Sequence, residues 1–347
     1  MKSITTYPLT EIKNLLQDLG QPSFRAQQLI DWIYVKGATS YDAMTNLPQT
    51  LRTLLSEHYP LHAPRIIDKQ ISHDGTRKYV LEFDDGVKVE TVGIPSFDTT
   101  PEGDPKHLTV CFSTQAGCPM QCAFCATGAE GLTRNLSSGE MILQIITVQN
   151  DFQTRVSHVV AMGQGEPFLN YDATLEALRF MNAKKGLEIG ARHITVSTCG
   201  VIPGIDRFAQ ELEQFTLAVS LHSAQQAIRD ELMPQCTRWP LSDLKEALCS
   251  YVDKTNRRVS LEYLMIKDLN DTPEALQSLY DFADGLLSHI NLIPFNSVDH
   301  CSYQPSTEAT IIQFQKALTR VGIETTIRNS RGSDIAGACG QLKNKLR

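Results

Sequence analysis

Three cysteines that lie close together in the sequence have the spacing of ligands to an iron–sulfur cluster. Cys118, Cys122 and Cys125 form a C-x-x-x-C-x-x-C pattern. Three thiolates at this spacing can bind three irons of a four-iron cube and leave the fourth iron open. A cluster with four cysteine ligands mainly carries electrons, whereas an open iron can bind a small molecule and pass an electron into it. The pattern therefore predicts a 4Fe-4S cluster that takes part in chemistry.

A structural zinc site is the alternative interpretation of these cysteines. Cys111 lies just upstream, and a structural zinc ion usually takes four Cys or His ligands arranged in two close pairs. The long gap between Cys111 and Cys118, and the three-residue gap that follows Cys118, do not resemble such pairs. We therefore favour the cluster. Colour and metal content after anaerobic purification would separate the two interpretations.

Composition and length indicate an ordinary globular protein. The chain has 347 residues, of which 41% are hydrophobic and 20% are charged, enough for one large domain and a smaller one. Residues 1–7 lack an apolar signal region, and no apolar run is long enough to span a membrane, so we expect a cytoplasmic protein with no membrane partner. Nine cysteines, an odd number, suit a reducing compartment. The net charge of −7 does not indicate a nucleic-acid partner.

The first part of the chain is predicted to form a small accessory domain, residues 1–95. Apolar residues recur at helical spacing within residues 1–60, which predicts short helices. Residues 66–72, 79–83 and 87–94 then read as a β-meander, because Asp74-Gly75 and Asp85-Gly86 are strong hairpin-turn dipeptides. Residues 96–107 are rich in Pro, Gly, Asp and Thr and are predicted to be a linker.

The remainder alternates β-rich runs with helix-sized intervals, which is typical of parallel strands with crossover helices. The six runs are residues 108–112, 159–162, 194–197, 216–220, 259–266 and 290–293. Polar clusters follow most of these runs, and convergence of strand ends on one site is the geometry of a barrel mouth. The fold class predicted is therefore α/β, with an incomplete TIM-like (β/α)6 barrel over residues 108–328. Residues 329–347 are expected to form a C-terminal loop and tail.

Each polar residue at a strand end has a structural and a functional interpretation. Gly165-Glu166-Pro167 could be a plain turn, or a place where backbone approaches a ligand and an acceptor binds its ammonium group. Ser197 and Ser220 could cap helices or form local turns. His222 could be a structural histidine with satisfied hydrogen bonds, and Asn296 could stabilise a turn.

Cys339 is the remaining cysteine with a notable context. Gly332, Gly337 and Gly340 surround it, which predicts a bent loop where the thiol could be exposed. By composition alone, a cysteine so far from the cluster pattern is simply a small residue. Arg328 or Arg331 could lower its pKa and make it reactive if either approaches it.

Taken together, these residues resemble the RlmN/Cfr family of radical S-adenosylmethionine RNA methyltransferases. The resemblance runs over nearly the whole chain, and its segments are residues 88–92, 111–125, 134–136, 165–167, 197–198, 220–222, 291–294 with Asn296, and 334–342. One departure is Gln164, where the family usually has methionine. The Gly-Glu pair that follows is retained.

The resemblance implies a cofactor and a role for each matching residue. The cluster at Cys118, Cys122 and Cys125 would bind S-adenosyl-L-methionine and cleave it to a 5′-deoxyadenosyl radical, with two molecules used per turnover. The matching binding positions are Gly165, Glu166, Ser197, Ser220, Leu221, His222 and Asn296.

Three further residues match the family's catalytic positions. Cys339 would be methylated first, and a radical formed on its S-methyl group would then add to the base. Glu90 would accept the proton that the base loses, although a glutamate on a strand is often only a solvated side chain. Cys111 would release the product by forming a transient disulfide with Cys339.

By the same resemblance, the substrates are 23S ribosomal RNA and tRNA, methylated at carbon 2 of adenosine. Residues 1–95 would recognise the RNA, although they hold 10 Lys or Arg and 11 Asp or Glu, a balance of −1. We expect a monomer that uses an external electron donor. A Cfr-type enzyme that methylates carbon 8 remains an alternative, as does a radical enzyme with a substrate other than RNA.

Overall fold

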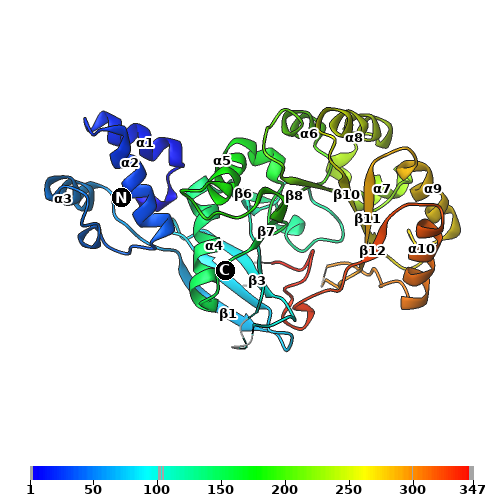
Figure 1. Ribbon diagram of the computed structural model, residues 1–347. Helices are drawn as coiled ribbons and strands as arrows, with labels where there is room; N and C mark the ends of the chain where they lie inside the picture. Colours follow the sequence, from blue (N-terminus) through cyan, green and yellow to red (C-terminus); the bar gives the residue numbers. More distant parts are fainter. Residues whose placement is uncertain (1–2, 101–102, 104, 299, 344–347) are drawn as a thin grey trace.

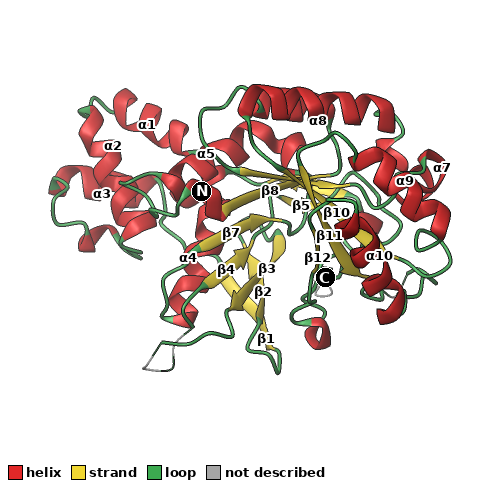
Figure 2. Cartoon of the chain, turned by 45° about the vertical axis from the view of Figure 1, so that its right-hand side comes forward, coloured by secondary structure: helices red, strands yellow, loops and turns green. Residues whose placement is uncertain are grey.

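The computed structural model describes residues 3–100, 103, 105–298 and 300–343. Within these residues, a ten-stranded sheet has the order β1-β2-β3-β4-β7-β8-β9-β10-β11-β12. Helices pack around this sheet, so the predicted α/β class is confirmed (Figure 2). The edge strands β1 and β12 are not paired with each other in the part of the chain that is described, which agrees with the predicted incomplete barrel.

The parallel part of the sheet contains all six predicted strands. It is formed by β4 (Leu108–Cys111), β7 (His158–Ala161), β8 (Ile194–Thr198), β9 (Thr216–Ser220), β10 (Val259–Met265), β11 (Ser288–Pro294) and β12 (Thr325–Ile327). Neighbours in this series pair in parallel. The strand β12 was not predicted, because three residues are too few to show a pattern.

Helices connect successive parallel strands and cover them. They are α4 (Ser138–Phe152), α5 (Tyr171–Asn182), α6 (Ile202–Phe208), α7 (Gln226–Leu232), α8 (Leu241–Thr255), α9 (Pro273–Ala283) and α10 (Glu308–Arg320). Strand residues such as Val159, Leu217 and Ile290 are fully buried, as expected where helices and neighbouring strands cover both faces. Because these strands are parallel, their carboxyl ends lie at the same edge of the sheet, and the polar clusters lie at that edge.

The predicted β-meander is confirmed, and it extends the same sheet. β1 (Arg65–Ile71), β2 (Arg77–Glu82) and β3 (Lys88–Pro95) pair antiparallel in turn. β3 also pairs antiparallel with β4, with Val92 opposite Cys111. The domain boundary expected after residue 95 thus falls between two paired strands, and the meander is hydrogen-bonded to the parallel part of the sheet.

Short helices form the N-terminal end of the molecule, as predicted. α1 (Leu9–Asp18), α2 (Ser23–Ile30) and α3 (Gln49–His58) pack together at one end, far from α9 and α10 (Figure 1). The carboxylate of Glu176 on α5 accepts hydrogen bonds from the backbone N–H groups of Leu9 and Thr10, at 3.0 and 2.8 Å. These bonds join the helical unit to the rest of the chain, and the exposed N–H groups of a helix start are natural partners for a carboxylate.

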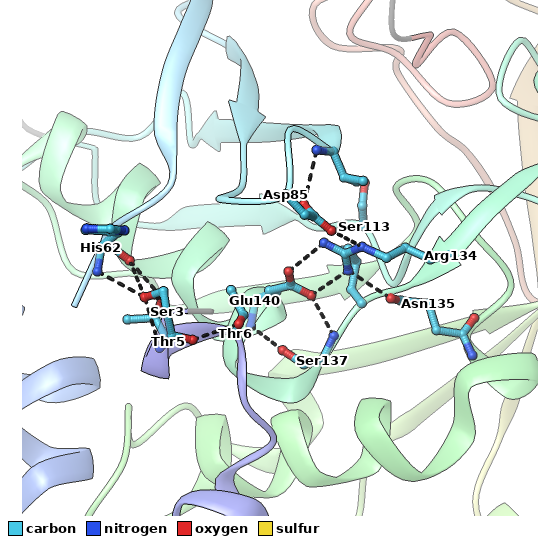
Figure 3. A network of polar contacts seen from close by, with 12 residues as sticks. Ser3, Thr5, Thr6, His62, Asp85, Ser113, Arg134, Asn135, Ser137 and Glu140 are labelled. Carbon is cyan, nitrogen blue, oxygen red and sulfur yellow. Dashed lines mark hydrogen bonds and ion pairs between the residues drawn. The ribbon is translucent and has the colours of Figure 1, made fainter. Parts of the chain in front are cut away.

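A two-stranded ribbon that the sequence did not predict carries the cysteine loop. β5 (Gln115–Gly117) pairs antiparallel with β6 (Leu132–Asn135) on either side of residues 118–131. Arg134 forms two hydrogen bonds with Glu140, at 2.8 and 2.9 Å, and a third with Asp85 at 2.7 Å (Figure 3). Glu140 also completes a capping box with Ser137 at the start of α4. The far end of the loop is thereby fixed to α4 and to the turn between β2 and β3.

No helix among the described residues has the length and apolar character needed to cross a membrane.

Candidate active site

A single cavity at the carboxyl ends of the parallel strands contains most of the predicted site residues. Its walls include Cys118, Cys122, Cys125, Gly165, Glu166, Ser197, Ser220, His222, Asn296 and Cys339. Leu221 is fully buried and is not among the lining residues, and its backbone N–H donates to Glu262. Cys111 lines an adjoining cavity that shares Cys339 with the first. Residues up to 221 positions apart in sequence thus meet at one place.

The three predicted cluster ligands face the cavity from one loop. Burial raises the pKa of Cys118 to about 12, and burial followed by neighbouring thiols raises the pKa of Cys122 well above its ordinary value. Burial also raises the pKa of Cys125. Such thiols ionise when a metal binds, because the metal replaces the lost hydration of the thiolate. Three soft donors around one cavity fit a 4Fe-4S cluster.

Glycine at position 117 allows the cysteine loop to close. Gly117 has φ +79°, and a Cβ placed there would lie 2.0 Å from the carbonyl oxygen of Gly131. The two ends of the loop are joined by a hydrogen bond from the N–H of Cys118 to the same carbonyl, at 2.9 Å. Only a residue without a side chain permits this approach.

Gly165 and Glu166 lie at the cavity wall after β7. Gly165 has φ +103°, and a Cβ there would lie 2.6 Å from the side chain of Gln115. The carboxylate of Glu166 accepts hydrogen bonds from the backbone N–H groups of Phe168 and Cys199, at 3.0 and 2.8 Å. Burial raises the pKa of this carboxyl. The turn interpretation is confirmed, because Glu166 caps a 3-10 helix. Glu166 also lines the cavity, and its binding of a ligand stays a prediction.

His222 combines a structural role with a position on the cavity wall. Its Nδ1 accepts a hydrogen bond from the backbone N–H of Leu264 at 3.2 Å, and its ring packs edge-on against Phe124, with 4.7 Å between centroids. Burial, and then the charge of Arg229, lowers its pKa to about 3. His222 is therefore neutral and carries its proton on Nε2, which makes that nitrogen a donor.

The hydroxyl residues at the ends of β8 and β9 have separate roles. Thr198 accepts hydrogen bonds from the N–H groups of Gly200 and Val201, both at 3.2 Å, and so forms the local turn. Ser197 and Ser220 line the cavity. The turn-forming interpretation that the sequence offered for Ser197 thus belongs to its neighbour.

Cys339 lies in a C-terminal segment that returns across the strand ends. Figure 1 shows this segment, in red, running from β12 towards the cyan strands. The carbonyl of Cys339 accepts a hydrogen bond from Asn296 Nδ2 at 3.4 Å, and the carbonyl of Gly340 accepts one from the N–H of Ala126 at 2.8 Å. The Thr127 hydroxyl donates to the carbonyl of Leu342 at 2.6 Å. The segment is thus attached directly to the cysteine loop.

Arg328, rather than Arg331, is the arginine beside the two distant thiols. The pKa of Arg328 is raised chiefly by Cys339, and then by Glu262 and Cys111. Arg331 also lines the adjoining cavity, but its guanidinium binds Asp74, with 2.9 Å between Nε and Oδ2. Burial, and then Cys339, raises the pKa of Cys111 to about 12, while Arg328 acts in the opposite direction. Both thiols are free in the structure.

Glu90 is buried on β3, so the alternative of a solvated side chain is wrong. Its exposed fraction is 2%. Its Oε1 lies 3.5 Å from Nζ of Lys78, and its Oε2 accepts a hydrogen bond from the backbone N–H of Lys343 at 2.6 Å. Glu90 thus contacts the segment that carries Cys339.

Comparison with known proteins shows where the chain belongs. Residues 4–60 match the family described as "Ribosomal RNA large subunit methyltransferase N-terminal domain", and residues 112–282 match the "Radical SAM superfamily". A protein of Clostridium novyi (strain NT), named "Probable dual-specificity RNA methyltransferase RlmN", is 40% identical over 99% of this chain and 98% of its own length. A protein of the same name from Staphylococcus aureus (strain JH9) is 44% identical, over 100% of this chain and 94% of its own length. This chain belongs to the RlmN family of radical S-adenosylmethionine RNA methyltransferases.

A solved relative of this RlmN-family chain supports the fold over its full length. The crystal structure of a radical SAM methyltransferase from Sphaerobacter thermophilus matches with a TM-score of 0.89 and 40% identity, covering 99% of each chain. The resemblance inferred from the residues is thus confirmed, together with the class of enzyme. Membership in the radical SAM superfamily implies a 4Fe-4S cluster and S-adenosylmethionine.

Sequence reasoning missed two charged residues of this RlmN-family site. Glu262 lies within β10, lines the cavity, and accepts a hydrogen bond from Asn291 at 2.9 Å. Lys78 is buried beside Glu90. A charged residue inside the apolar run of β10 was a usable signal for Glu262, because buried strands seldom carry an unpaired charge. The sequence around Lys78 offered no comparable signal.

Proposed function

We propose that this enzyme methylates carbon 2 of adenosine in 23S ribosomal RNA and tRNA through an S-methylcysteine relay. The observation that carries the proposal is the position of Cys339, which lines one cavity with Cys118, Cys122 and Cys125 and a second with Cys111. A methyl-carrying thiol would need access to both the cluster and a resolving thiol. Cys339 shares one cavity with the cluster cysteines and the other with Cys111.

The target atom explains why a relay would be needed. Carbon 2 of adenine is electron-poor and has no lone pair to attack a methyl sulfonium, so polar methyl transfer is not available there. Cys118, Cys122 and Cys125 would hold the cluster, which when bound supplies the electron that cleaves S-adenosylmethionine. Gly165, Glu166, Ser197, Ser220, Leu221, His222 and Asn296 are the proposed binding positions for this cofactor.

The residues of the C-terminal segment and of β3 would then carry the methyl group. Cys339 would accept a methyl group from one S-adenosylmethionine, and a second would be consumed to activate it for addition to the base. Glu90 would accept the proton lost from the adduct. The Cys111 thiolate would attack the sulfur of Cys339 and break the bond from that sulfur to the methylene carbon on the base. That carbon would take up a proton to become the methyl group, and Cys111 and Cys339 would be left as a disulfide. The position of Arg328 beside both thiols supports this assignment, since its positive charge partly offsets the burial that raises the pKa of Cys111.

The substrates are inferred from the relatives. Both curated relatives carry the name "dual-specificity RNA methyltransferase", which favours ribosomal RNA and tRNA as substrates. The match of residues 4–60 to a ribosomal RNA methyltransferase domain favours RNA recognition by α1–α3. We further propose a cytoplasmic monomer that receives electrons from an external donor.

The test is nucleoside analysis after anaerobic turnover. Reconstituted protein, a reductant and methyl-deuterated S-adenosylmethionine are incubated with unmodified 23S ribosomal RNA or tRNA, and nucleosides are compared with 2-methyl- and 8-methyladenosine standards. Label in 2-methyladenosine supports the proposal. Label in 8-methyladenosine would replace it with the Cfr-type reaction, and release of 5′-deoxyadenosine without a methylated base would indicate a different substrate.

A further inference from the structure

Arg229 is a fully buried cation whose hydrogen-bonding capacity is largely unused. Its exposed fraction is 0%. Nη2 donates to the carbonyl oxygen of Cys199 at 2.7 Å. Nε and Nη1 have no hydrogen-bond partner within the part of the chain that the structure describes. A buried guanidinium in this state is strongly unfavourable unless an anion lies nearby, because its hydration is lost and not replaced.

The surroundings of Arg229 connect it to the cluster loop. Arg229 lies on α7, and the last residue of that helix, Leu232, accepts a hydrogen bond from the N–H of Ala123 at 2.9 Å. Ala123 stands between the cluster ligands Cys122 and Cys125. Cys199, which accepts the one hydrogen bond of Arg229, lines the same cavity as those ligands. The guanidinium therefore lies directly behind the cavity wall.

The groups around Arg229 do not neutralise it. The carboxylate of Glu166 on this wall is already engaged, because its two oxygens accept hydrogen bonds from the N–H groups of Phe168 and Cys199. The thiol of Cys236 donates to the same Cys199 carbonyl as Arg229, at 3.4 Å. No carboxylate forms an ion pair with Arg229 among the described residues. Its field does reach the cavity wall, since it contributes to the lowered pKa of His222.

A bound cluster would supply the missing negative charge. Three thiolates outweigh the charge of the oxidised four-iron core, so the assembled site is an anion, and reduction adds a further negative charge. A fixed positive charge nearby stabilises the reduced form more than the oxidised form. The positive charge of Arg229, whose Nε and Nη1 have no hydrogen-bond partner among the described residues, thus complements the negative charge of a cluster bound in the neighbouring cavity.

We propose that Arg229 is the buried counter-charge of the cluster held by Cys118, Cys122 and Cys125, and that it raises the reduction potential of that cluster. Arg229 does not touch substrate in this assignment; it acts through the cluster. The inference rests on the cluster alone and not on the RNA substrate or the methylated carbon.

The experiment compares reduction potentials in three anaerobically reconstituted variants. Arg229→Met removes the charge while keeping the side-chain length, and Arg229→Lys keeps a positive charge. Arg257→Met is the matched control, because Arg257 also donates to backbone carbonyls, those of Glu213 and Phe215, but lies at the amino ends of β9 and β10. Iron content is measured first, and the cluster is then titrated by EPR spectroscopy without S-adenosylmethionine or RNA.

The expected result is a shift confined to the variant without charge. At a fixed applied potential, the ratio of reduced to oxidised cluster should fall about tenfold in Arg229→Met, which for a one-electron couple is about 59 mV. Arg229→Lys should retain most of the wild-type ratio, and Arg257→Met all of it. A cluster that assembles in Arg229→Lys but not in Arg229→Met would also support the proposal, because only the lysine variant keeps a positive charge at this position.

Two outcomes would overturn it. One is a wild-type potential in a fully loaded Arg229→Met protein. The other is a lysine variant that behaves like the methionine variant, either in potential or in failing to hold iron, because Arg229 would then be needed for its shape and its bond to Cys199. Neither outcome depends on whether the enzyme methylates carbon 2, carbon 8 or another substrate.

Discussion

Nζ of Lys78 lies 3.5 Å from Oε1 of Glu90, and both side chains are buried. Besides this ion pair, each of the two side chains forms one hydrogen bond with the C-terminal segment. Lys78 donates to the carbonyl of Ala336 at 3.3 Å, and Glu90 accepts from the N–H of Lys343 at 2.6 Å. The pair therefore fixes both sides of the segment that carries Cys339. Buried ion pairs are tolerated when further polar contacts complete each partner, as they do here.

Lys78→Met should destabilise the protein, because it leaves the buried carboxylate of Glu90 without this cation. We expect the free energy of unfolding to fall by about 3 kcal/mol, measured by urea denaturation. The double variant Lys78→Met/Glu90→Gln should recover part of that loss, since it removes the charge as well. Lys69→Met is the control, because the ion pair of Lys69 with Asp151 is partly exposed and should contribute no more than about 1 kcal/mol. A loss in Lys78→Met equal to the control would contradict the structural role of the pair.

Gly165→Ala should disturb the cofactor wall of the cavity. Alanine would be strained at the positive φ of this position, and its Cβ would lie only 2.6 Å from the side chain of Gln115. Gly285→Ala is the matched control, since Gly285 has φ +74° but nothing within 4 Å of the added Cβ. We expect Gly165→Ala to be less stable than Gly285→Ala by about 2 kcal/mol and to bind S-adenosylmethionine more weakly, as measured by calorimetry. Equal stability of the two variants would mean that Gln115 moves aside without cost.

Much of the site could be predicted because parallel strands bring their carboxyl ends together. Gly165, Ser197 and Ser220 follow β-branched runs that are easy to recognise, and the barrel geometry then places them around one cavity. The cluster ligands were predicted from spacing alone, since C-x-x-x-C-x-x-C is a chemical pattern that does not depend on the fold.

The remaining residues depend on contacts between distant parts of the chain. Lys78 meets Ala336 across 258 positions, and no local pattern encodes such a contact. The sequence offered Arg328 and Arg331 equally as neighbours of Cys339, and only the structure shows that Arg331 is held by Asp74 instead. Leu221 matches the family pattern, yet its side chain is packed in the core and not on the cavity wall.

The neutral state of His222 predicts a specific loss of stability in acid. Its pKa is lowered to about 3 by burial and then by Arg229, so the unfolded chain binds a proton more readily than the folded protein. This contribution is complete above the ordinary histidine pKa of about 6.5 and is lost as the pH falls towards 3. Between about pH 6 and pH 5, the unfolding free energy of the wild type should fall by about 1 kcal/mol more than that of His222→Asn. Parallel pH profiles for the two proteins would show that His222 is protonated in the folded state.

Cys111→Ala tests the proposed relay, because it should stop the reaction after the base has become attached to Cys339. In the proposed order of steps, only Cys111 cleaves the thioether and releases the base. Both Cys111 and Cys339 line the same cavity. The variant should therefore accumulate a covalent protein–RNA species, seen as a gel shift that RNase removes. Cys339→Ala should keep its brown, oxygen-sensitive cluster but form neither the adduct nor methylated adenosine.

The double variant Cys111→Ala/Cys339→Ala provides the control for this trap, since an adduct through any other residue would persist in it. The pKa of Cys111 is raised to about 12, chiefly by burial and then by Cys339, so its thiolate is scarce at neutral pH. Resolution of the adduct by the wild type should consequently speed up as the pH rises, while adduct formation in Cys111→Ala should not follow the same profile. Turnover by Cys111→Ala without an adduct would assign release to another group, whereas methylation by Cys339→Ala would exclude the relay altogether.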